Sequence, residues 1–580
     1  MARWAADSRL GKSFRLIASA HLLVRNGRLH ELVKTASSCL ARGEVHRLLR
    51  WCRETVAIEQ RLSAKSYRRW RLDHEVSPDE LTVETDAHEV TVLMVVDSSI
   101  SMDALGLDYQ LARDWKCLFV DASHDGLAEP TSARIDITVD FVTMDAHSSH
   151  SAFDFGLAHV STKFVLALTP GARLHPQTLG LLLATAKRTD ADLIYSDEDR
   201  MIQGVRADPY FKPDFSIDLH RAEDYIGPVV LMRRTVVEPF LSSDATTHGC
   251  IYRLVERLYE ANAKIVHVPR VLVHWAVARD RNVAGIRRSS LMERRSNSSS
   301  SPVSASAASD SVVSIVIPTR DRIDLLAECL RSVYESSPRL NFELIVLNNR
   351  SAEERSMQWL AQASCKYHNL RVVNADYDFN WSRLCNHGIE LARGDVFIFL
   401  NNDVEVISED WMTGLVKQAT RPEVGAVGGL LLYPDGAIQH GGIVVGMSGF
   451  ADHLYVGYSG GPEERHLFVS PYLGRNVLAC TGACLAIERR KLDKVGLFDE
   501  SFPTSGDVEM CLRLIDKGYL NVYDPTVRLY HHESQTRGTG PVDSAEVECL
   551  RPVLQPYLDD GDPYYNENLS LSLRYPTFVD

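Results

Sequence analysis

Short β-branched runs alternate with helical stretches along residues 312–400, and this alternation constrains the fold more than any other feature of the sequence. The strand-like runs are VVSIVIP (312–318), FELIVL (342–347), LRVVNA (370–375) and DVFIFL (395–400). Helices are expected between them at residues 323–335 and through Asn386–Ala392. Strand–helix–strand alternation with these lengths indicates a mostly parallel sheet with right-handed crossovers.

The first of these helices, IDLLAECLRSVYE, has a clear apolar face. Leu326, Cys329, Leu330 and Val333 recur at helical spacing, so this face is expected to pack on the sheet. Asp321 lies close to the start of the helix and is expected to cap it.

The first half of the chain repeats this order more faintly. Its strand-like runs are VTVLMVVD (90–97), KCLFVD (116–121), KFVLAL (163–168), ADLIYSD (191–197) and AKIVHVPRVLVHW (263–275). The last run has a counterpart in LNVYDPTVRLYHH, residues 520–532. We therefore predict an α/β protein with two tandem Rossmann-type domains, each with a mostly parallel sheet.

A low-complexity stretch, SNSSSSPVSASAASDS, separates the two halves at residues 296–311. It carries almost no apolar bulk, so it cannot offset the entropy of ordering and is expected to be a flexible linker. The predicted segments are a helical N-terminal segment (1–85), a first domain (86–290), the linker (291–311), a second domain (312–540) and a C-terminal tail (541–580).

Composition narrows the functional class. A chain of 580 residues with a formal net charge of −14 is not expected to bind nucleic acid in general, because the phosphate backbone requires a basic surface. No apolar run reaches the roughly 18–20 residues of a membrane span. Eleven cysteines without a CxxC pair fit reduced thiols. We expect a soluble, cytoplasmic protein.

The N-terminal residues are basic, although the chain as a whole has a negative net charge. Residues 1–54 carry eleven Lys or Arg against four Asp or Glu, and SFRLIASAHLLVRNGRLHELV has apolar residues at helical spacing. A basic amphipathic helix packed on the next domain is the simpler interpretation. The alternative is peripheral docking to the anionic inner face of the cytoplasmic membrane.

Polar residues gather where the strands of the second half end. Asn401, Asn402 and Asp403 follow the strand 395–400 directly, and ligands of parallel sheets bind at this edge. Asp403 could terminate the strand, cap a helix or bind a metal ion. In the first half, KFVLALTPGARL ends the equivalent strand without a carboxylate, so strand termination does not require one. This contrast favours a chemical role for Asp403.

Two further groups lie later in the second half. Asp507 and Glu509 belong to the helical stretch SGDVEMCLRLIDKG, and His531 and His532 follow a strand. From the residues alone, a carboxylate at a helix start is most often a cap, and a histidine pair is most often structural.

With these motifs in order, residues 312–540 resemble the family 2 glycosyltransferases, which are inverting sugar-nucleotide enzymes of the GT-A fold. The resemblance rests on VSIVIPTRDR, ELIVLNNRS, LNNDVEV, LLYPDGAIQHGG, TGACLAIERRKLDKVGLFDE, GDVEMCLRL and HHES. The YPDGAIQHGG, TGACL and HHES segments look like a bacterial subgroup that builds O-antigens and other surface polysaccharides, often with rhamnose. DPYYNENLSL (562–571) resembles the ending of that subgroup.

The resemblance implies a substrate class and partners. The donor would be a nucleotide-diphosphate sugar, either dTDP- or UDP-linked, and the acceptor a glycan or a lipid-linked glycan. Other polysaccharide-assembly enzymes would be further partners.

It also implies a metal site and a base. Asp403 would bind Mn²⁺ or Mg²⁺ at the place of the family's D-x-D motif, where Asn401 replaces the first aspartate. His531 or His532 would complete the metal shell. Asp507 would be the general base that takes the proton of the acceptor hydroxyl.

The resemblance also implies which residues would bind the nucleotide sugar and line the pocket. The nucleotide-sugar site would contain six residues: Pro318, Thr319, Asp321, Asn348, Asn401 and Asn402. Asn348 stands where an aspartate commonly contacts a uracil or thymine edge. The donor and acceptor pocket would be lined by Gln439, His440, Thr481, Gly482 and Glu509.

The first half resembles the same family through YSDEDR, FKPDFSID, YIGPVVLMRR and HVPRVLVHW. Thr169-Pro170-Gly171 fill the place of the D-x-D motif, and Ile251 that of the base, whereas His274 is expected to be retained. We predict that this half has lost catalysis. Asp197, Glu198 and Asp199 could restore a second metal site, which would make the enzyme bifunctional. A non-catalytic glycan-binding scaffold is the other alternative, and Asn401 and Asn348 favour it.

Overall fold

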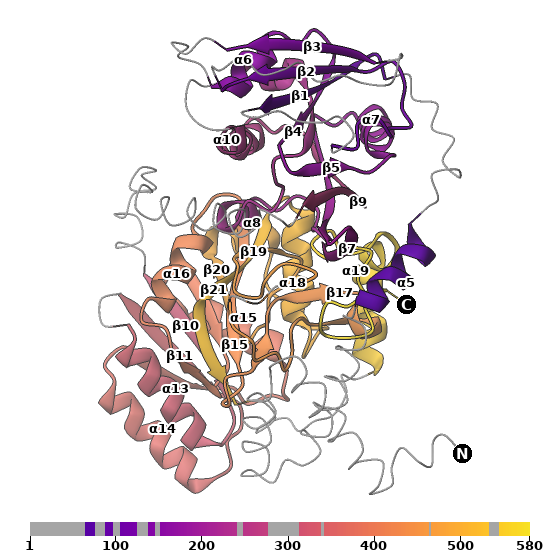
Figure 1. The fold of residues 1–580 in the computed structure, drawn as a ribbon. Coiled ribbons are helices and arrows are strands. Elements are labelled where there is room, and N and C mark those ends of the chain that lie inside the picture. The colour runs from indigo at the N-terminus through magenta and orange to yellow at the C-terminus, as the bar shows by residue number, and fades with distance from the viewer. Residues whose placement is uncertain are drawn as a thin grey trace, which may run out of the picture.

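The structure is a computed structural model of the chain (Figure 1). It describes residues 64–75, 87–96, 105–123, 137–144, 151–240, 247–276, 312–337, 341–462, 464, 466–532 and 544–579. The basic stretch at residues 13–33, the predicted linker and the end of the HHES motif lie outside the described residues.

The second half is built on a ten-stranded sheet in the order β12-β11-β10-β13-β20-β15-β21-β14, with β16 (Ile438–His440) and β19 (Arg475–Val477) paired beside this path. Four parallel strands form one side: β10 (Val313–Thr319), β11 (Phe342–Asn348), β12 (Leu370–Asn374) and β13 (Val396–Leu400). β20 (Cys484–Glu488) runs antiparallel to β13 and to β15 (Val424–Leu432). β21 (Leu520–His531) pairs parallel with β15, and β14 (Val404–Val406) pairs antiparallel with β21.

Helices cover this sheet, including the predicted ones at 323–335, near Asn386–Ala392 and after Ser505. They include α13 (Ile323–Glu335), α14 (Glu354–Lys366), α15 (Trp381–Leu391), α16 (Trp411–Ala419) and α18 (Gly506–Asp516). The apolar stripe of α13 is buried as expected, since Leu326, Cys329, Leu330 and Val333 are fully inaccessible to solvent. The four predicted strands of residues 312–400 are all confirmed.

The expected role of Asp321 as a cap of α13 is corrected. Arg322 holds the N-cap position of α13, with φ of 48°. Asp321 Oδ1 instead accepts hydrogen bonds from the backbone N–H groups of Ala352 (2.8 Å) and Glu353 (2.9 Å), just before α14. Asp321 therefore ties the end of β10 to the start of α14.

The first half contains a second sheet with the same strand order, β3-β2-β1-β4-β8-β6-β9-β5. Its strands are β1 (Val90–Val96), β2 (Lys116–Asp121), β3 (Thr138–Thr143), β4 (Phe164–Leu168), β5 (Ala172–Leu174), β6 (Leu193–Ile202), β7 (Val205–Tyr210), β8 (Val230–Arg233) and β9 (Ile265–Ala276). Each pair of neighbouring strands in this sheet is parallel or antiparallel in the same way as the equivalent pair in the other sheet. The predicted duplication of one α/β unit is thus confirmed. Its helices include α6 (Ala152–Ala158), α7 (Thr178–Thr189) and α10 (Thr247–Glu260).

The two halves meet through α8 (Ile217–Ala222), which lies against β19 (Figure 1). Asp218 of α8 forms an ion pair with Arg421 at 2.5 Å and accepts a hydrogen bond from Asn476 Nδ2 at 2.7 Å. Ser216 Oγ donates to Asn476 Oδ1 at 2.8 Å. These side chains are largely buried, so the contact joins the halves through a satisfied polar network.

Asp218→Ala should lower the free energy of unfolding by about 3 kcal/mol, because it leaves the Arg421 guanidinium buried with one partner fewer. Urea denaturation followed by tryptophan fluorescence measures this loss. Glu260→Ala, at the exposed end of α10, is the matched control and should change stability by less than about 0.5 kcal/mol. Equal effects of the two variants would contradict the structural role of the ion pair.

The C-terminal segment contains α19 (Ser544–Asp560), which packs along α18, and then returns to the first half. Pro563 O accepts from the backbone N–H of Asp214 at 2.8 Å, and Asn568 Nδ2 donates to Pro269 O at 2.9 Å. At the other end of the described chain, Tyr67 of α5 (Ala64–His74) stacks on Phe578, with ring centroids 5.7 Å apart. Residues from both ends of the sequence therefore close the junction of the halves.

Asp562 in this segment makes stability depend on pH. Burial raises the pKa of its carboxyl to about 7, although the backbone N–H groups of Tyr564 and Val445 donate to it. The folded form therefore holds a proton that the unfolded form has released, and stability falls as pH rises through about 7. Between pH 6 and 9 we expect a loss of about 1.4 kcal/mol from this group. Denaturation at several pH values should show a smaller slope in Asp562→Asn.

Among the residues that the structure describes, no helix combines the length and the apolar character needed to cross a bilayer.

Candidate active site

Two strands bring Asp403 and His531 together. Asn401-Asn402-Asp403 connect the end of β13 to β14, and Val404 of β14 pairs with His531 at the end of β21. Asp403 Oδ1 lies 3.2 Å from His531 Nε2. Residues far apart in the sequence thus meet at one edge of the sheet.

The imidazole of His531 is held in a defined orientation. Its Nδ1 donates to Gln439 Oε1 at 2.6 Å, since an amide oxygen can only accept. In the neutral ring, Nε2 then carries a lone pair that faces Asp403. A cation satisfies two acceptors in this arrangement, and a metal-binding histidine usually donates the hydrogen of its other ring nitrogen to an acceptor, as His531 does to Gln439.

The carboxyl of Asp403 is poised to be ionised. Burial disfavours its charge, but when the His531 ring carries both protons, its hydrogen bond and charge outweigh burial and lower the pKa of Asp403 below the ordinary value. Only 6% of the residue is exposed, so its charge is weakly screened by water.

The two histidines differ in their surroundings. His532 Nε2 lies 3.6 Å from Glu405 Oε2, because successive residues of an extended chain point to opposite sides. Asn401 Nδ2 lies 3.4 Å from His531 Nε2, so the Asn401 amide borders the same position as Asp403. Geometry therefore favours His531 over His532 as a ligand.

This donor set fits Mn²⁺ or Mg²⁺. Within the described ranges, no three His, Cys, Asp or Glu side chains are grouped as a metal cage. Hard divalent cations that act on phosphates commonly bind through one or two protein ligands and complete their shell with phosphate oxygens and water. One carboxylate and one imidazole meet this requirement, with the Asn401 amide beside them, and the imidazole favours Mn²⁺.

Asp507 occupies the first turn of α18, and its carboxylate is fixed from two sides. Oδ2 accepts from the backbone N–H of Gly482 at 2.6 Å, and Oδ1 accepts from that of Val508 at 2.9 Å. The next residue of the loop, Ala483, accepts from the N–H of Asn401 at 3.1 Å. Residues 482–483 thus connect Asp507 to the Asn401–Asp403 turn.

Position 482 has room only for a glycine. A Cβ at this position would lie 2.5 Å from the indole of Trp381. The close approach lets the loop reach both Asp507 and the end of β13.

The expected nucleotide residues lie at neighbouring strand ends. Thr319 of β10 pairs with Asn348 of β11, with Pro318 one step before it. Asn402 Nδ2 donates to Thr319 Oγ1 at 2.9 Å, and Asn348 Nδ2 donates to Asn374 Oδ1 at 3.0 Å. The metal-binding turn and these strand ends therefore share one edge of the sheet.

Two residues expected in the pocket have other partners. Glu509 forms an ion pair with Arg513 one turn along α18, at 2.8 Å. His440 is fully buried, and its Nδ1 lies 3.1 Å from His453 Nδ1. Burial and the charges of His453 and Arg475 lower the pKa of His440 well below its ordinary value. Both residues thus have partners within the protein, and their place in the pocket stays a prediction. Thr481 Oγ1 accepts from the N–H of Ala483 at 3.3 Å and shapes the loop.

Residues 314–496 match the family model described as glycosyl transferase family 2. The second half of the chain carries a family 2 glycosyltransferase domain. Its match covers β10 through α17 (Arg489–Val495), so it includes the Asn401–Asp403 turn.

Relatives extend beyond this family 2 domain. The chain is 33% identical to uncharacterized protein y4gI of Sinorhizobium fredii and 33% identical to O-antigen biosynthesis protein RfbC of Myxococcus xanthus. Each match covers 80% of this chain, and 55% and 38% of the relative, respectively. An N-acetylglucosaminyl-diphospho-decaprenol L-rhamnosyltransferase of Mycobacterium tuberculosis is 30% identical over 30% of this chain and 63% of its own length.

The chain thus spans about half or less of the length of the first two curated relatives. Residues 312–580 make up less than half of this chain, so both matches must extend well into its first half. The first α/β unit is therefore shared with these relatives.

The strand register corrects one expectation about the first half. Ala172 pairs with Trp275 as Val404 of the family 2 domain pairs with His531. Trp275 therefore takes the place of the candidate metal histidine, and His274 matches Tyr530. His274 is not a retained ligand.

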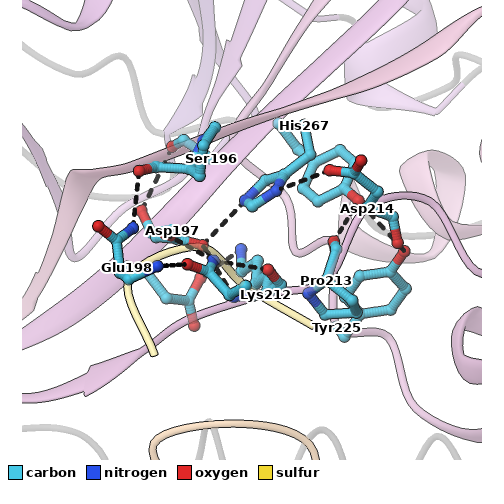
Figure 2. Close-up of polar contacts among 12 residues, drawn as sticks. Ser196, Asp197, Glu198, Lys212, Pro213, Asp214, Tyr225 and His267 are labelled. Carbon is cyan, nitrogen blue, oxygen red and sulfur yellow. Dashed lines mark hydrogen bonds and ion pairs between the residues drawn. The ribbon is translucent and has the colours of Figure 1, made fainter. Parts of the chain in front are cut away.

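The acidic cluster of the first half is neutralised by the chain itself (Figure 2). Asp197 Oδ1 lies 2.9 Å from His267 Nε2 and accepts from the N–H of Lys212 at 2.8 Å. Glu198 Oε2 is 3.0 Å from Lys212 Nζ. Asn566 of the C-terminal segment also donates to Asp197, at 3.1 Å.

Asp199 is engaged in the same way. Tyr67 OH and Arg206 Nε each lie 2.6 Å from its Oδ2, and His274 Nδ1 lies 2.6 Å from its Oδ1. The three carboxylates are paired with protein cations and donors, and Ile251, at the place of the base, is 1% exposed. These contacts weigh against a second metal site and indicate that the cluster holds the halves together. This network could not be predicted from the sequence, since its partners are far apart along the chain.

Proposed function

We propose that the chain is a metal-dependent inverting glycosyltransferase with one active site, in residues 312–540. It transfers a sugar from a nucleotide-diphosphate donor to a hydroxyl of a growing surface glycan. The observation that carries this proposal is the link between Asp403–His531 and Asp507. Residues 482–483 join the two groups by hydrogen bonds to Asp507 and to Asn401.

Asp403, His531 and the Asn401 amide would hold Mn²⁺ or Mg²⁺ at the end of β13. When bound, the cation offsets the negative charge that develops on the diphosphate leaving group. Gln439 supports this site by fixing the ring of His531.

Asp507 acts as the general base. Inversion requires one carboxylate to take the proton of the acceptor hydroxyl as its oxygen attacks the anomeric carbon. The two N–H groups that donate to Asp507 fix the direction of its carboxylate.

Thr319 and Asn348, with Pro318 beside them, would receive the nucleotide, with Asn402 fixing Thr319. A dTDP- or UDP-sugar is the proposed donor. Rhamnose is the favoured sugar because one relative is named an L-rhamnosyltransferase and another an O-antigen biosynthesis protein. The acceptor would be a glycan or lipid-linked glycan.

The reaction would take place in the cytoplasm, where reduced cysteines persist, and the described cysteines are all unpaired with one another. The basic segment 1–54 would bring the enzyme to the anionic inner face of the membrane, where lipid-linked acceptors and other assembly enzymes are found. The first half would serve packing and chain positioning.

A donor screen tests the proposal. Purified protein is incubated with dTDP- and UDP-sugars and a glycan acceptor, with and without Mn²⁺, and release of nucleoside diphosphate is measured. We expect release from at least one donor that depends on Mn²⁺ and on acceptor. Tight glycan binding by calorimetry without release from any donor would instead support a non-catalytic scaffold.

A further inference from the structure

A carboxylate from the C-terminal helix holds the turn that precedes Asp507. Glu546 of α19 accepts four hydrogen bonds from two consecutive residues of this turn. The N–H groups of Thr504 and Ser505 donate at 2.8 and 2.7 Å, and their hydroxyls donate at 2.7 and 2.6 Å. The helices α18 and α19 lie side by side, which brings Glu546 to this position (Figure 1).

These contacts replace the ordinary cap of α18. Ser505 is the N-cap residue, and within the described residues its side chain makes no cap bond to α18. Its hydroxyl is directed to Glu546 instead. The start of the helix that carries Asp507 is therefore defined by a residue of another helix, about 40 positions later in the chain.

The opposite side of the turn is packed against α15. A Cβ at Gly506 would lie 2.0 Å from Ser382 Oγ, and this hydroxyl donates to Phe502 O at 2.6 Å. The turn at residues 502–506 is held between α15 and Glu546, and these contacts fix its position. Asp507 is the next residue in the sequence.

Glu546 is suited to this role by its charge. The residue is 5% exposed. Burial disfavours ionisation, but the hydrogen bonds from Ser505 and Thr504 outweigh it and lower the pKa of Glu546. Bonds to an ionised acceptor are stronger than neutral ones and hold the donors more firmly.

We propose that Glu546 is a positioning residue for the general base: its carboxylate fixes the Thr504–Ser505 turn and so directs Asp507 at the acceptor hydroxyl. This inference rests on the proposed role of Asp507. The C-terminal segment, which carries Glu546, would thus have a function in the active site. The same segment is also bound to the first half through Asn566 and Asn568.

The test compares Glu546→Gln with Glu548→Gln, a change on an exposed position of the same helix. Glu546→Gln removes the negative charge, so that three donors bond a neutral amide oxygen at Oε1, and it places an NH₂ group against the Thr504 hydroxyl at Oε2. We expect kcat to fall about 10- to 100-fold, as small misplacements of catalytic groups do, with KM for the donor changed less than about two-fold. Glu548→Gln should match the wild type. Ser505→Ala, which removes a single bond to Glu546, should show a smaller loss of kcat in the same direction.

A double variant separates positioning from general destabilisation. In the Asp507→Asn background, Glu546→Gln should lower the residual kcat no further, because the group that it positions is gone. Equal losses of kcat in both backgrounds would overturn the proposal.

Hydrogen exchange supplies a readout that does not require activity. The amide of Gly482 is held by Asp507, so it should exchange at least about 10-fold faster in Glu546→Gln than in the wild type and in Glu548→Gln. Faster exchange in a protein that transfers no sugar would uphold the positioning and overturn the proposed function. Unchanged exchange, or unchanged kcat in an active enzyme, would overturn the positioning.

Discussion

Asp507→Asn is expected to lower kcat for sugar transfer by about 10²- to 10⁴-fold, the usual contribution of a general base. The asparagine keeps the size of the side chain and can still accept from Gly482 N–H, but it cannot take a proton. KM for the donor should change little, because Asp507 lies on a different element from the residues proposed to bind nucleotide. Rates of nucleoside diphosphate release with saturating donor and acceptor measure this effect.

Asp516→Asn is the matched control for that variant. Asp516 ends the same helix and is exposed, so the same chemical change there should leave kcat within about two-fold. If Asp507→Asn turned over at the wild-type rate, the assignment of the base would be wrong.

Removal of His531 should weaken Mn²⁺ binding and transfer together. His531→Ala removes the imidazole ligand and leaves Asp403 without it, so we expect Mn²⁺ affinity to fall at least about 10- to 100-fold in the presence of nucleoside diphosphate. Asp403→Asn should have a larger effect on both quantities, because a hard cation prefers a charged oxygen. Titration of Mn²⁺ by electron paramagnetic resonance measures the affinity directly.

The neighbouring histidine is the control in this case. The His532 ring lies 3.6 Å from Glu405, whereas the backbone N–H of His532 is what bonds Asp403 O, so His532→Ala should change Mn²⁺ affinity less than about three-fold. A larger loss in His532→Ala than in His531→Ala would reverse the choice of ligand.

The sheet and its duplication could be predicted from the sequence because strand and helix periods are local. The runs at 312–318, 342–347, 370–375 and 395–400 all became strands, and they pair in parallel as strand–helix–strand alternation predicts. The place of Asp403 at the end of a buried strand followed from the same pattern. The choice between His531 and His532 could not be predicted, since it depends on the side of β21 to which each ring points.

The errors have equally specific causes. His274 was matched to the histidine pair because the residue type is the same. The register of β5 and β9 shows that His274 is displaced by one position from the equivalent of His531. A shift of one residue reverses the side to which a strand residue points. Glu509 lies two positions after Asp507, on a different side of the same helix, and its place in the pocket stays a prediction. The partners of Glu546 and Asp197 could not be predicted, because tertiary contacts alone bring them together.

One measurement tests the central claim that all transfer occurs in the second half. The products made from active donors are analysed for Asp403→Asn and for Asp197→Asn, each normalised to the amount of folded protein. We predict that every product disappears in Asp403→Asn and that every product persists in Asp197→Asn. A product that persists in Asp403→Asn and is lost in Asp197→Asn would contradict the account and establish a second active site in the first half.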